Sequence, residues 1–209
     1  MSLDVPAGER VALSGTAAGT LTALLRAVAG LHPVTGGVIT VGGRDTRTPA
    51  ERAWRSRACA WLPSDPGVTG RTVPAATVLA RSAHPAAAAQ AAERLGVGRL
   101  VARPLRSLTR RQVKLLHLAR VIGCVALGAG VLLADDPTAG LTAADREALA
   151  DLLAGLPVTL MVSTDDPVLT VLCGLRVDIA MPLPAQGTAP PVPCAEPPGT
   201  TNSLSFQSS

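Results

Sequence analysis

The residues best suited to chemistry follow an apolar run at residues 131–134, which ends in the adjacent carboxylates Asp135 and Asp136. A carboxylate at the end of a buried strand can hold Mg²⁺, directly or through water, beside a set of phosphates. A second carboxylate next to it could orient or deprotonate a water molecule. An acidic turn that only caps the strand is the alternative, but the sequence PTAGL at residues 137–141 makes it less plausible. We therefore predict a metal-binding role for Asp135 and a catalytic role for Asp136.

The loop GTAAGTLT at residues 15–22 lies between a predicted strand and a predicted helix. Backbone N–H groups and the helix dipole attract anions at such a position without the help of side chains. A phosphate-binding loop reads G-x-x-x-x-G-K-[ST], where the lysine contacts phosphates and the hydroxyl contacts magnesium. Gly15 and Thr22 fit this pattern. Thr20, however, replaces the second glycine, and Leu21 replaces the lysine. On its own, the loop is more simply interpreted as an ordinary strand-to-helix turn.

The elements that must position these residues alternate between short apolar runs and helix-like segments, which predicts a parallel sheet flanked by helices. Strands are expected at residues 10–14, 37–41, 58–62, 131–134, 158–163 and 176–181. Helices are expected at residues 22–31, 108–122 and 143–156, and most of residues 68–107 is expected to be helical. Gly42 and Gly43 are expected to form a turn. The predicted fold class is therefore α/β.

Composition narrows the class of protein. Apolar residues form 47% of the 209-residue chain, enough for one domain with a sizeable core. The net charge is +4, but the arginines are scattered and only 1% of residues are aromatic, which argues against nucleic-acid binding. The four cysteines are widely spaced, as expected of free thiols in a reducing compartment. The longest apolar stretch, about 14 residues at 121–134, is shorter than the ~20 that a membrane span needs. We therefore predict a soluble cytoplasmic protein that reaches a membrane only through a partner.

Five segments carry a resemblance to a known family. In chain order, they are SLDVPAGERVAL, ALLRAVAGL, TGGVITVGGRD, LARVI and LLADDPTAGL. With these segments, residues 2–181 resemble the ATP-binding subunit of an ATP-binding cassette (ABC) transporter, from the family's second strand onward. The resemblance implies a P-loop NTPase-like parallel sheet core with a small helical insert, at about residues 66–107 of a domain covering residues 1–181. Seven prolines within the remaining residues, 182–209, predict a disordered tail.

The resemblance also implies a role for each matching position. Nucleotide would be bound by Gly15, Thr16, Ala17, Ala18, Gly19, Thr20, Leu21 and Thr22. The signature segment, which faces a partner's nucleotide, would be Leu108, Thr109, Arg110, Arg111 and Gln112. Magnesium would be held by Thr22 and Asp135, and the catalytic glutamate corresponds to Asp136. The Q-loop glutamine, the D-loop aspartate and the switch histidine correspond to Ser64, Thr142 and Thr164. The three histidines, His32, His84 and His117, miss the switch position and are interpreted as surface or packing residues.

Departures from the family's pattern predict weak ATP binding and impaired hydrolysis. Leu21 removes a charge-assisted contact worth about 1.5–3 kcal/mol. The shorter side chain of Asp136 draws its carboxylate back, and a misplacement of about 1 Å can lower a rate on the order of a hundredfold. Arg110 and Arg111 fill space where glycine would let a backbone approach. ATP and Mg²⁺ are therefore expected as cofactors of low affinity, and enzymatic activity is left open.

The leading hypothesis is a transporter subunit that pairs with a transmembrane permease at the inner face of the membrane, as a homo- or heterodimer with another nucleotide-binding subunit. The alternative is a non-catalytic scaffold or regulator that keeps the fold and no longer binds nucleotide. A third interpretation is a decayed or truncated reading frame that does not fold stably, because the family's first strand has no counterpart here and the tail is of low complexity. Titration with Mg-ATP separates the first two interpretations, and a cooperative melt would dismiss the third.

Overall fold

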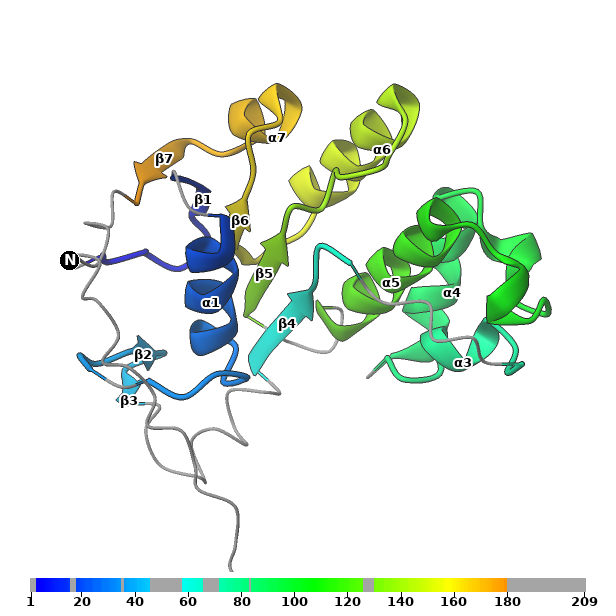
Figure 1. The fold of residues 1–209 in the computed structure, drawn as a ribbon, viewed down its shortest axis with the longest axis horizontal. Coiled ribbons are helices and arrows are strands. Elements are labelled where there is room, and N and C mark those ends of the chain that lie inside the picture. Colours follow the sequence, from blue (N-terminus) through cyan, green and yellow to red (C-terminus); the bar gives the residue numbers. More distant parts are fainter. Residues whose placement is uncertain are drawn as a thin grey trace, which may run out of the picture.

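A computed structural model describes residues 3–15, 18–34, 36–45, 58–65, 72–82, 84–125 and 130–179. In this part of the chain, five parallel strands form one sheet in the order β4-β5-β6-β1-β7 (Figure 1). The strands are β1 (Arg10–Ser14), β4 (Cys59–Leu62), β5 (Val131–Asp135), β6 (Thr159–Ser163) and β7 (Leu175–Asp178). The predicted α/β class is confirmed, and each of these strands starts within one residue of its predicted start.

The register places the carboxyl ends of neighbouring strands at one edge of the sheet. Asp135 at the end of β5 pairs with Ser163 at the end of β6, and Ser163 in turn pairs with Leu13 of β1. Open parallel sheets bind their ligands at the edge where the strands end. The loop after β1 and the carboxylate of Asp135 are thereby brought to the same edge, as their sequence patterns predicted.

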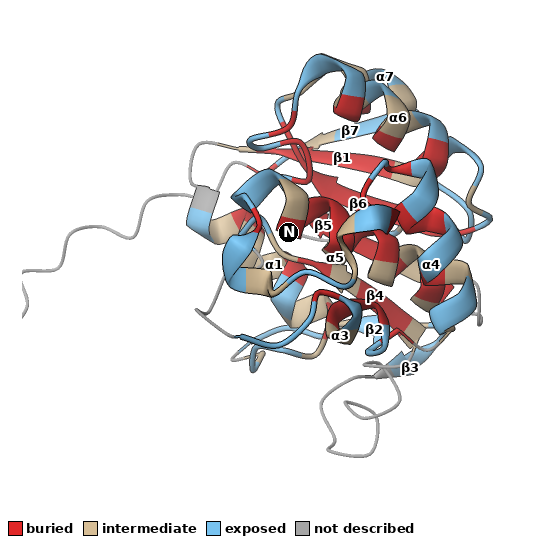
Figure 2. Cartoon of the chain, turned by 90° about the vertical axis from the view of Figure 1, so that its right-hand side faces the viewer, coloured by how far each residue is buried: buried red, intermediate tan, exposed pale blue. Residues whose placement is uncertain are grey.

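Helices cover both faces of the sheet (Figure 1). They are α1 (Ala18–Val28), α3 (Ala76–Leu79), α4 (Pro85–Arg94), α5 (Arg110–Val125), α6 (Ala143–Ala154) and α7 (Pro167–Leu172), with the 3-10 turns η1 (Gly98–Leu100) and η2 (Leu105–Ser107). Because successive strand residues point to opposite faces, Leu13 joins the apolar cluster of α1, whereas its neighbour Ala12 joins the cluster of α5 and α6. Figure 2 shows the buried residues concentrated along the central strands between these layers.

A small hairpin stands apart from the main sheet. β2 (Thr40–Val41) pairs antiparallel with β3 (Arg44–Asp45) in a separate two-stranded sheet. Gly42 and Gly43 form the predicted turn with φ angles of 57° and 75°, as a two-residue type I′ hairpin requires. The longer strand predicted at residues 37–41 was wrong, because only its last two residues find strand partners. β3 was missed, since two residues give no alternating pattern.

Helix boundaries differ from the sequence prediction by a few residues. The helix predicted at residues 22–31 begins earlier, at Ala18, and ends at Val28, just before Gly30 with its φ of 77°. α5 begins at Arg110 because Thr109 caps it, and α7 was not predicted. The limits of the predicted domain and of its helical insert stay predictions.

The described helices are all too short or too polar to cross a membrane. Thr16 and Ala17 of the predicted nucleotide loop lie outside the described residues, and so does the predicted tail at residues 182–209.

Candidate functional site

A buried carboxylate links the start of α1 to the ends of two central strands. Asp135 is only 4% exposed, and its Oδ2 accepts a hydrogen bond of 2.9 Å from the Thr22 hydroxyl. Its Oδ1 accepts a second bond, of 2.7 Å, from the hydroxyl of Ser163. The two residues predicted to hold magnesium therefore lie in direct contact. Ser163 was not predicted, although its place at the end of the neighbouring strand could have indicated it.

The next carboxylate, Asp136, lies in a different environment. Its side chain is exposed, while its backbone N–H donates to the carbonyl and the hydroxyl of Ser163, each at 3.0 Å. Its φ is +40°, a left-handed conformation that aspartate tolerates better than most residues other than glycine. This turn directs the chain away from the sheet immediately after β5 and separates the two carboxylates into one buried and one solvent-facing group.

A glycine follows β1, and a buried leucine lies in the first turn of α1. A Cβ added at Gly15 would lie 2.8 Å from the backbone oxygen of Ile179, so no larger residue fits without a shift. Leu21, at the position that matches the family's lysine, is 7% exposed and packs in an apolar cluster with Leu13, Leu25 and others. The described start of α1 thus offers backbone N–H groups to an anion but no cationic side chain, and the Thr22 hydroxyl donates its proton to Asp135.

The signature-like segment forms the start of α5. Thr109 and Gln112 bond reciprocally: the Thr109 N–H donates to Gln112 Oε1 at 3.0 Å, and the Gln112 N–H donates to Thr109 Oγ1 at 3.2 Å. This is a capping box, which satisfies two backbone donors at the helix end. Leu108 before it is buried, and Arg110 and Arg111 after it are exposed.

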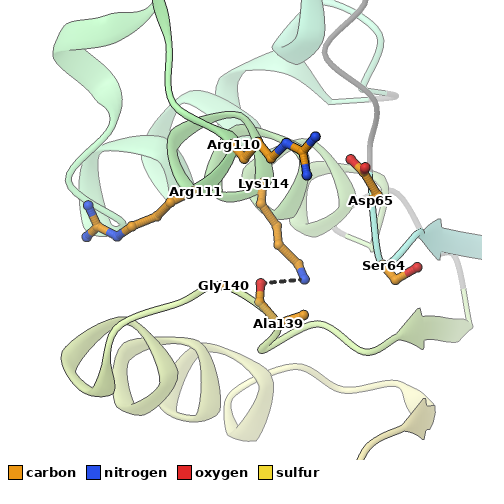
Figure 3. A pocket seen from close by; sticks show the side chains of 7 residues that line it. All are labelled: Ser64, Asp65, Arg110, Arg111, Lys114, Ala139 and Gly140. Atoms are coloured by element: carbon orange, nitrogen blue, oxygen red, sulfur yellow. Dashed lines mark hydrogen bonds between the residues drawn. The ribbon is translucent and has the colours of Figure 1, made fainter.

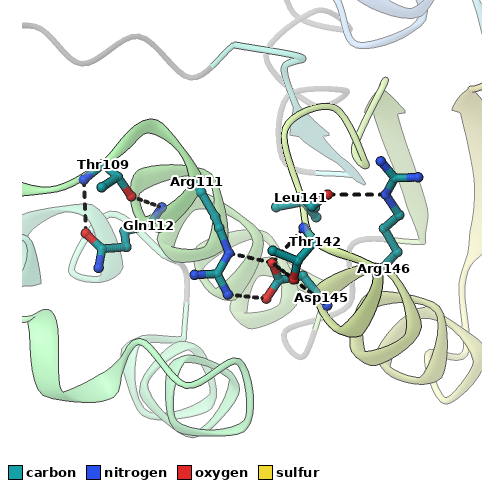
Figure 4. A network of polar contacts seen from close by, with 7 residues as sticks. All are labelled: Thr109, Arg111, Gln112, Leu141, Thr142, Asp145 and Arg146. Carbon is teal, nitrogen blue, oxygen red and sulfur yellow. Dashed lines mark hydrogen bonds and ion pairs between the residues drawn. The ribbon is translucent and has the colours of Figure 1, made fainter.

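Arg111 ties the start of α5 to the start of α6 (Figure 4). Its guanidinium donates to both carboxylate oxygens of Asp145, each at 2.5 Å. Asp145 also forms a capping box with Thr142, the D-loop-like position, so Thr142 serves as the N-cap of α6. The hydrogen bonds from Arg111 hold the pKa of the Asp145 carboxyl well below its usual range. Sequence reasoning missed this contact, since 34 residues separate the partners.

Lys114, the only lysine of the chain, lies one turn further along α5 (Figure 3). It is only 3% exposed, and its Nζ donates to the backbone oxygens of Asp136 at 2.7 Å and Ala139 at 2.9 Å. Burial lowers the pKa of its ammonium group, and the carboxylates of Asp136, Asp135 and Asp65 partly offset that effect. No role was predicted for Lys114, although a lone lysine among apolar helix residues is the kind of signal that could have found it.

The switch-like and Q-loop-like positions, Thr164 and Ser64, lie in turns that follow strands of the sheet. Thr164 is buried, and its hydroxyl accepts a 3.0 Å hydrogen bond from the N–H of Asp166, which caps α7. Asp166 in turn forms a 3.1 Å ion pair with Arg146 of α6. Thr164 is therefore part of a turn that starts α7. Ser64, the Q-loop-like position, is exposed at the end of β4 beside Asp65.

Among the described residues, the three histidines do not contact the cluster of Thr22, Asp135 and Ser163. His84 caps α4, its Nδ1 accepting a 3.1 Å hydrogen bond from the N–H of Ala87. His117 has a buried Nδ1 with no hydrogen-bond partner, and burial lowers its pKa to about 4, with a smaller contribution from Arg120. His32 is exposed.

In the described part of the chain, no three His, Cys, Asp or Glu side chains gather as metal ligands. One carboxylate and one hydroxyl fit Mg²⁺ that arrives with phosphates and water, since Mg²⁺ commonly binds in this way.

Comparisons with known proteins agree with this geometry. A family model described as "ABC transporter" matches residues 1–139. The cobalt import ATP-binding protein CbiO of Rhodobacter capsulatus is 33% identical over 190 residues, which cover 85% of this chain and 67% of that protein. Two solved structures share the fold at 19% identity: the ATP-binding cassette MJ0796, a dimer bound to ADP and Pi, and cbiO1 of Clostridium perfringens, described as part of the transporter complex cbiONQ. Their TM-scores are 0.71 and 0.68; the matches cover 84% and 85% of this chain, and 83% and 76% of theirs. The chain therefore belongs to the ABC transporter family, as an ATP-binding domain homologous to CbiO.

Proposed function

We propose that this chain is a CbiO-like subunit that works with a transmembrane permease at the inner face of a membrane, with weak nucleotide binding and impaired hydrolysis. One observation carries the proposal. The Thr22 hydroxyl and the Asp135 carboxylate lie 2.9 Å apart at the carboxyl edge of the sheet, while Leu21 beside them is packed into the core. The residues that would hold the metal are in place, and the side chain that would hold the phosphates is apolar.

Binding of Mg-ATP is supported by the chemistry of the described residues. Mg²⁺, when bound with ATP, would neutralise charge on the phosphate oxygens. Thr22 and Asp135 supply the hydroxyl and carboxylate oxygens that Mg²⁺ prefers. Ser163 donates to the far oxygen of Asp135 and thereby fixes the orientation of the carboxylate. The N-terminus of α1 would attract the phosphates through its backbone N–H groups.

Weak affinity follows from the missing cation. A charge-assisted hydrogen bond contributes about 1.5–3 kcal/mol, so its loss at Leu21 corresponds to roughly a ten- to hundredfold lower affinity.

Impaired hydrolysis is supported by two further residues. The Asp136 carboxylate is shorter than glutamate and faces solvent. The Thr164 hydroxyl already accepts a hydrogen bond from a backbone N–H, and it carries no group that titrates near neutral pH.

Calorimetric titration of the purified chain with Mg-ATP tests this proposal. We expect weak binding that Asp135→Asn abolishes, whereas the matched variant Asp151→Asn, at an exposed carboxylate of α6, leaves it unchanged. Phosphate release from ATP should stay near the uncatalysed baseline. Robust ATPase activity that Asp135→Asn removes would overturn the proposed impairment of hydrolysis.

A non-catalytic scaffold or regulator is the second candidate function, and the burial of Leu21 favours it. A leucine that packs into the core at this position stabilises the fold without any ligand. Absence of both heat and a thermal shift with Mg-ATP, in a chain that still copurifies with its permease, would select the scaffold.

The partner and cargo are proposed from the relatives. The Rhodobacter relative is named for cobalt import, and the Clostridium structure belongs to a complex with other subunits. We extend a permease partner and a transition-metal cargo to this chain. Metal uptake by cells that carry the permease, with and without this chain, tests both, and equal uptake would contradict them. Light scattering of the purified chain, alone and mixed with a second nucleotide-binding subunit, tests the proposed homo- or heterodimer.

A further inference from the structure

β7 is an end strand of the main sheet, and one of its two edges faces away from β1. Figure 1 shows β7 at the opposite end of the sheet from α3, α4 and α5. Leu175, Arg176 and Asp178 are exposed, and Val177 is half-buried. Among the described strands, none pairs with the outer edge of β7. Such an edge presents backbone N–H and C=O groups that can pair with a further strand.

The backbone of β7 shows which residues have their hydrogen-bonding groups at the outer edge. The N–H of Ile179 donates to the carbonyl of Ser14, at the end of β1, at 2.7 Å. Along a strand, the backbone groups of alternate residues point to the same edge. The N–H and C=O groups of Val177 therefore also point toward β1. Those of Arg176 and Asp178 point outward.

The side chains of Arg176 and Asp178 share one face of the sheet, because residues two apart in a strand point to the same side. Val177 points to the other face, where it packs against the apolar cluster that contains Leu13. The Arg176 Nε–H donates to Ser14 Oγ at 3.3 Å, and a guanidinium has five N–H donors in all. Within the described part of the chain, neither Arg176 nor Asp178 forms an ion pair. The outer edge therefore carries a cation and a carboxylate on one face.

Two copies of this edge are complementary in antiparallel alignment. A twofold axis beside Val177 would place Arg176 of each copy directly opposite Asp178 of the other. Opposite residues whose backbone groups point toward each other exchange two hydrogen bonds, so both pairs would be of the hydrogen-bonded kind. Their side chains would meet on the same face, and opposite charges directly across an antiparallel pair are stabilising.

Charge also selects this register over its neighbours. An alignment centred on Arg176 would set two guanidinium groups opposite each other, and one centred on Asp178 would do the same with two carboxylates. Like charges at such positions are destabilising. The chain's own residues 182–193 make a poor partner strand by sequence: they include five prolines, at both even and odd positions, and proline has no N–H to donate. The edge therefore fits a second copy of itself best.

We propose that two copies of this chain associate through their β7 edges, in antiparallel alignment, with Arg176 of each copy paired with Asp178 of the other. The two sheets then form one continuous sheet. The contact uses no residue of the Thr22–Asp135–Ser163 cluster or of the signature-like segment, so it needs no nucleotide and does not rest on the function proposed above. One short strand from each copy falls in the class of interfaces below ~1,200 Å², which associate weakly.

Sedimentation velocity of the full chain over a wide concentration range, without nucleotide or Mg²⁺, measures this association. Arg176→Asp and Asp178→Arg each turn both attractive pairs into repulsive ones, and each should weaken the dimer on the order of tenfold. An equimolar mixture of the two variants has opposite charges at both pairs again and should dimerise as the unchanged chain does. Asp151→Arg, the same charge change at an exposed carboxylate of α6, should have no effect.

Several results would overturn the proposal. A full chain that stays monomeric at every concentration leaves the edge to solvent or to residues 180–209. A mixture that fails to dimerise, or a control that weakens the dimer equally, removes the role of the two charges. A dimer that Arg110→Asp disrupts and the β7 variants do not lies at the start of α5 instead. If a charge reversal prevents folding, Arg176→Gln and Asp178→Asn provide the same test with effects of several-fold. A failed ATP titration changes none of these outcomes.

Discussion

Two helices, α1 and α5, contact the residues that end or follow β5, and their chemistry differs. α1 contributes the Thr22 hydroxyl to a buried carboxylate, packs Leu21 into the core, and has its one basic residue, Arg26, in the last turn. α5 begins with two arginines and inserts the ammonium of Lys114 between backbone carbonyls. The side chains at the start of α1 carry no cation, whereas three cations occupy the first five residues of α5.

This difference shows that the helix backbone attracts anions at both starts, while the side chains make the two starts chemically different. Both helix starts offer N–H groups and a partial positive charge, whatever the sequence. The side chains decide what each start can bind. A hydroxyl and a carboxylate at α1 suit a ligand that brings its own metal. At α5, Arg111 and Lys114 instead bond within the protein, to Asp145 and to two backbone oxygens.

The largest expected effect comes from Lys114→Met, which removes the cation that joins α5 to the loop after β5. Two backbone oxygens would lose a charged donor inside the protein, and each such bond contributes about 1.5–3 kcal/mol. Because the variant also relieves the cost of burying an ammonium, we expect the free energy of unfolding to fall by about 3 kcal/mol. Urea denaturation measures it, with Arg106→Met as the exposed control.

The same residue allows a check without mutation. Lys114 is the only lysine of the chain, so an amine-reactive reagent should label the native protein at the N-terminus alone. Labelling at Lys114 should appear only after denaturant is added, because the side chain is 3% exposed. Rapid labelling of Lys114 in the native state would contradict the contact.

Gly15→Ala tests the α1 side of the comparison. The added Cβ would meet the backbone oxygen of Ile179 at 2.8 Å, so β1 or β7 must shift. Overpacking of this kind costs about 1–3 kcal/mol, and we expect a loss near 2 kcal/mol in thermal or urea unfolding. Gly19→Ala is the matched control: nothing lies within 4 Å of its added Cβ, and alanine in a helix is favoured over glycine by up to about 1 kcal/mol. Equal effects of the two substitutions would contradict the close approach.

Asp145→Asn should produce a smaller, pH-dependent loss. Asp145 has a folded-state pKa below its unfolded value near 3.9, so its ion pair with Arg111 contributes stability above about pH 4 and loses it as the pH falls further. Since Arg111 is 42% exposed, we expect a loss of about 1 kcal/mol at pH 7. The difference from the unchanged chain should begin to shrink below about pH 4 and should keep shrinking as the pH is lowered toward about 2. Asp151→Asn, at an exposed carboxylate, should show no such convergence.

The sequence predicted the α1 side better than the α5 side, for physical reasons. β1, β5 and β6 have short apolar runs that the sequence pattern identifies as strands. The family resemblance, and not the chain order, predicted that Thr22 lies near Asp135, because β6 lies between β5 and β1 in the sheet. The contacts of Lys114 and Arg111 depend on how α5 packs against residues that lie 22 to 34 positions away in the sequence, and no local pattern predicts such contacts. The burial of Leu21 could have been predicted in part, because its spacing of four residues from Leu25 indicates that both lie on one apolar face of the helix.

Thr109→Ala gives the smallest expected effect and tests whether α5 is held mainly by its cap or by its cations. Thr109 Oγ1 accepts the Gln112 N–H at 3.2 Å, and loss of an exposed N-cap hydroxyl costs about 0.5–1 kcal/mol. We expect the lower end of that range in urea denaturation, because Arg111 and Lys114 still anchor the first turns of α5 to the core. Thr109→Ser keeps the acceptor and should restore full stability. If Thr109→Ala instead costs as much as Lys114→Met, the cap rather than the cations positions this helix, and the contrast between α1 and α5 becomes one of capping.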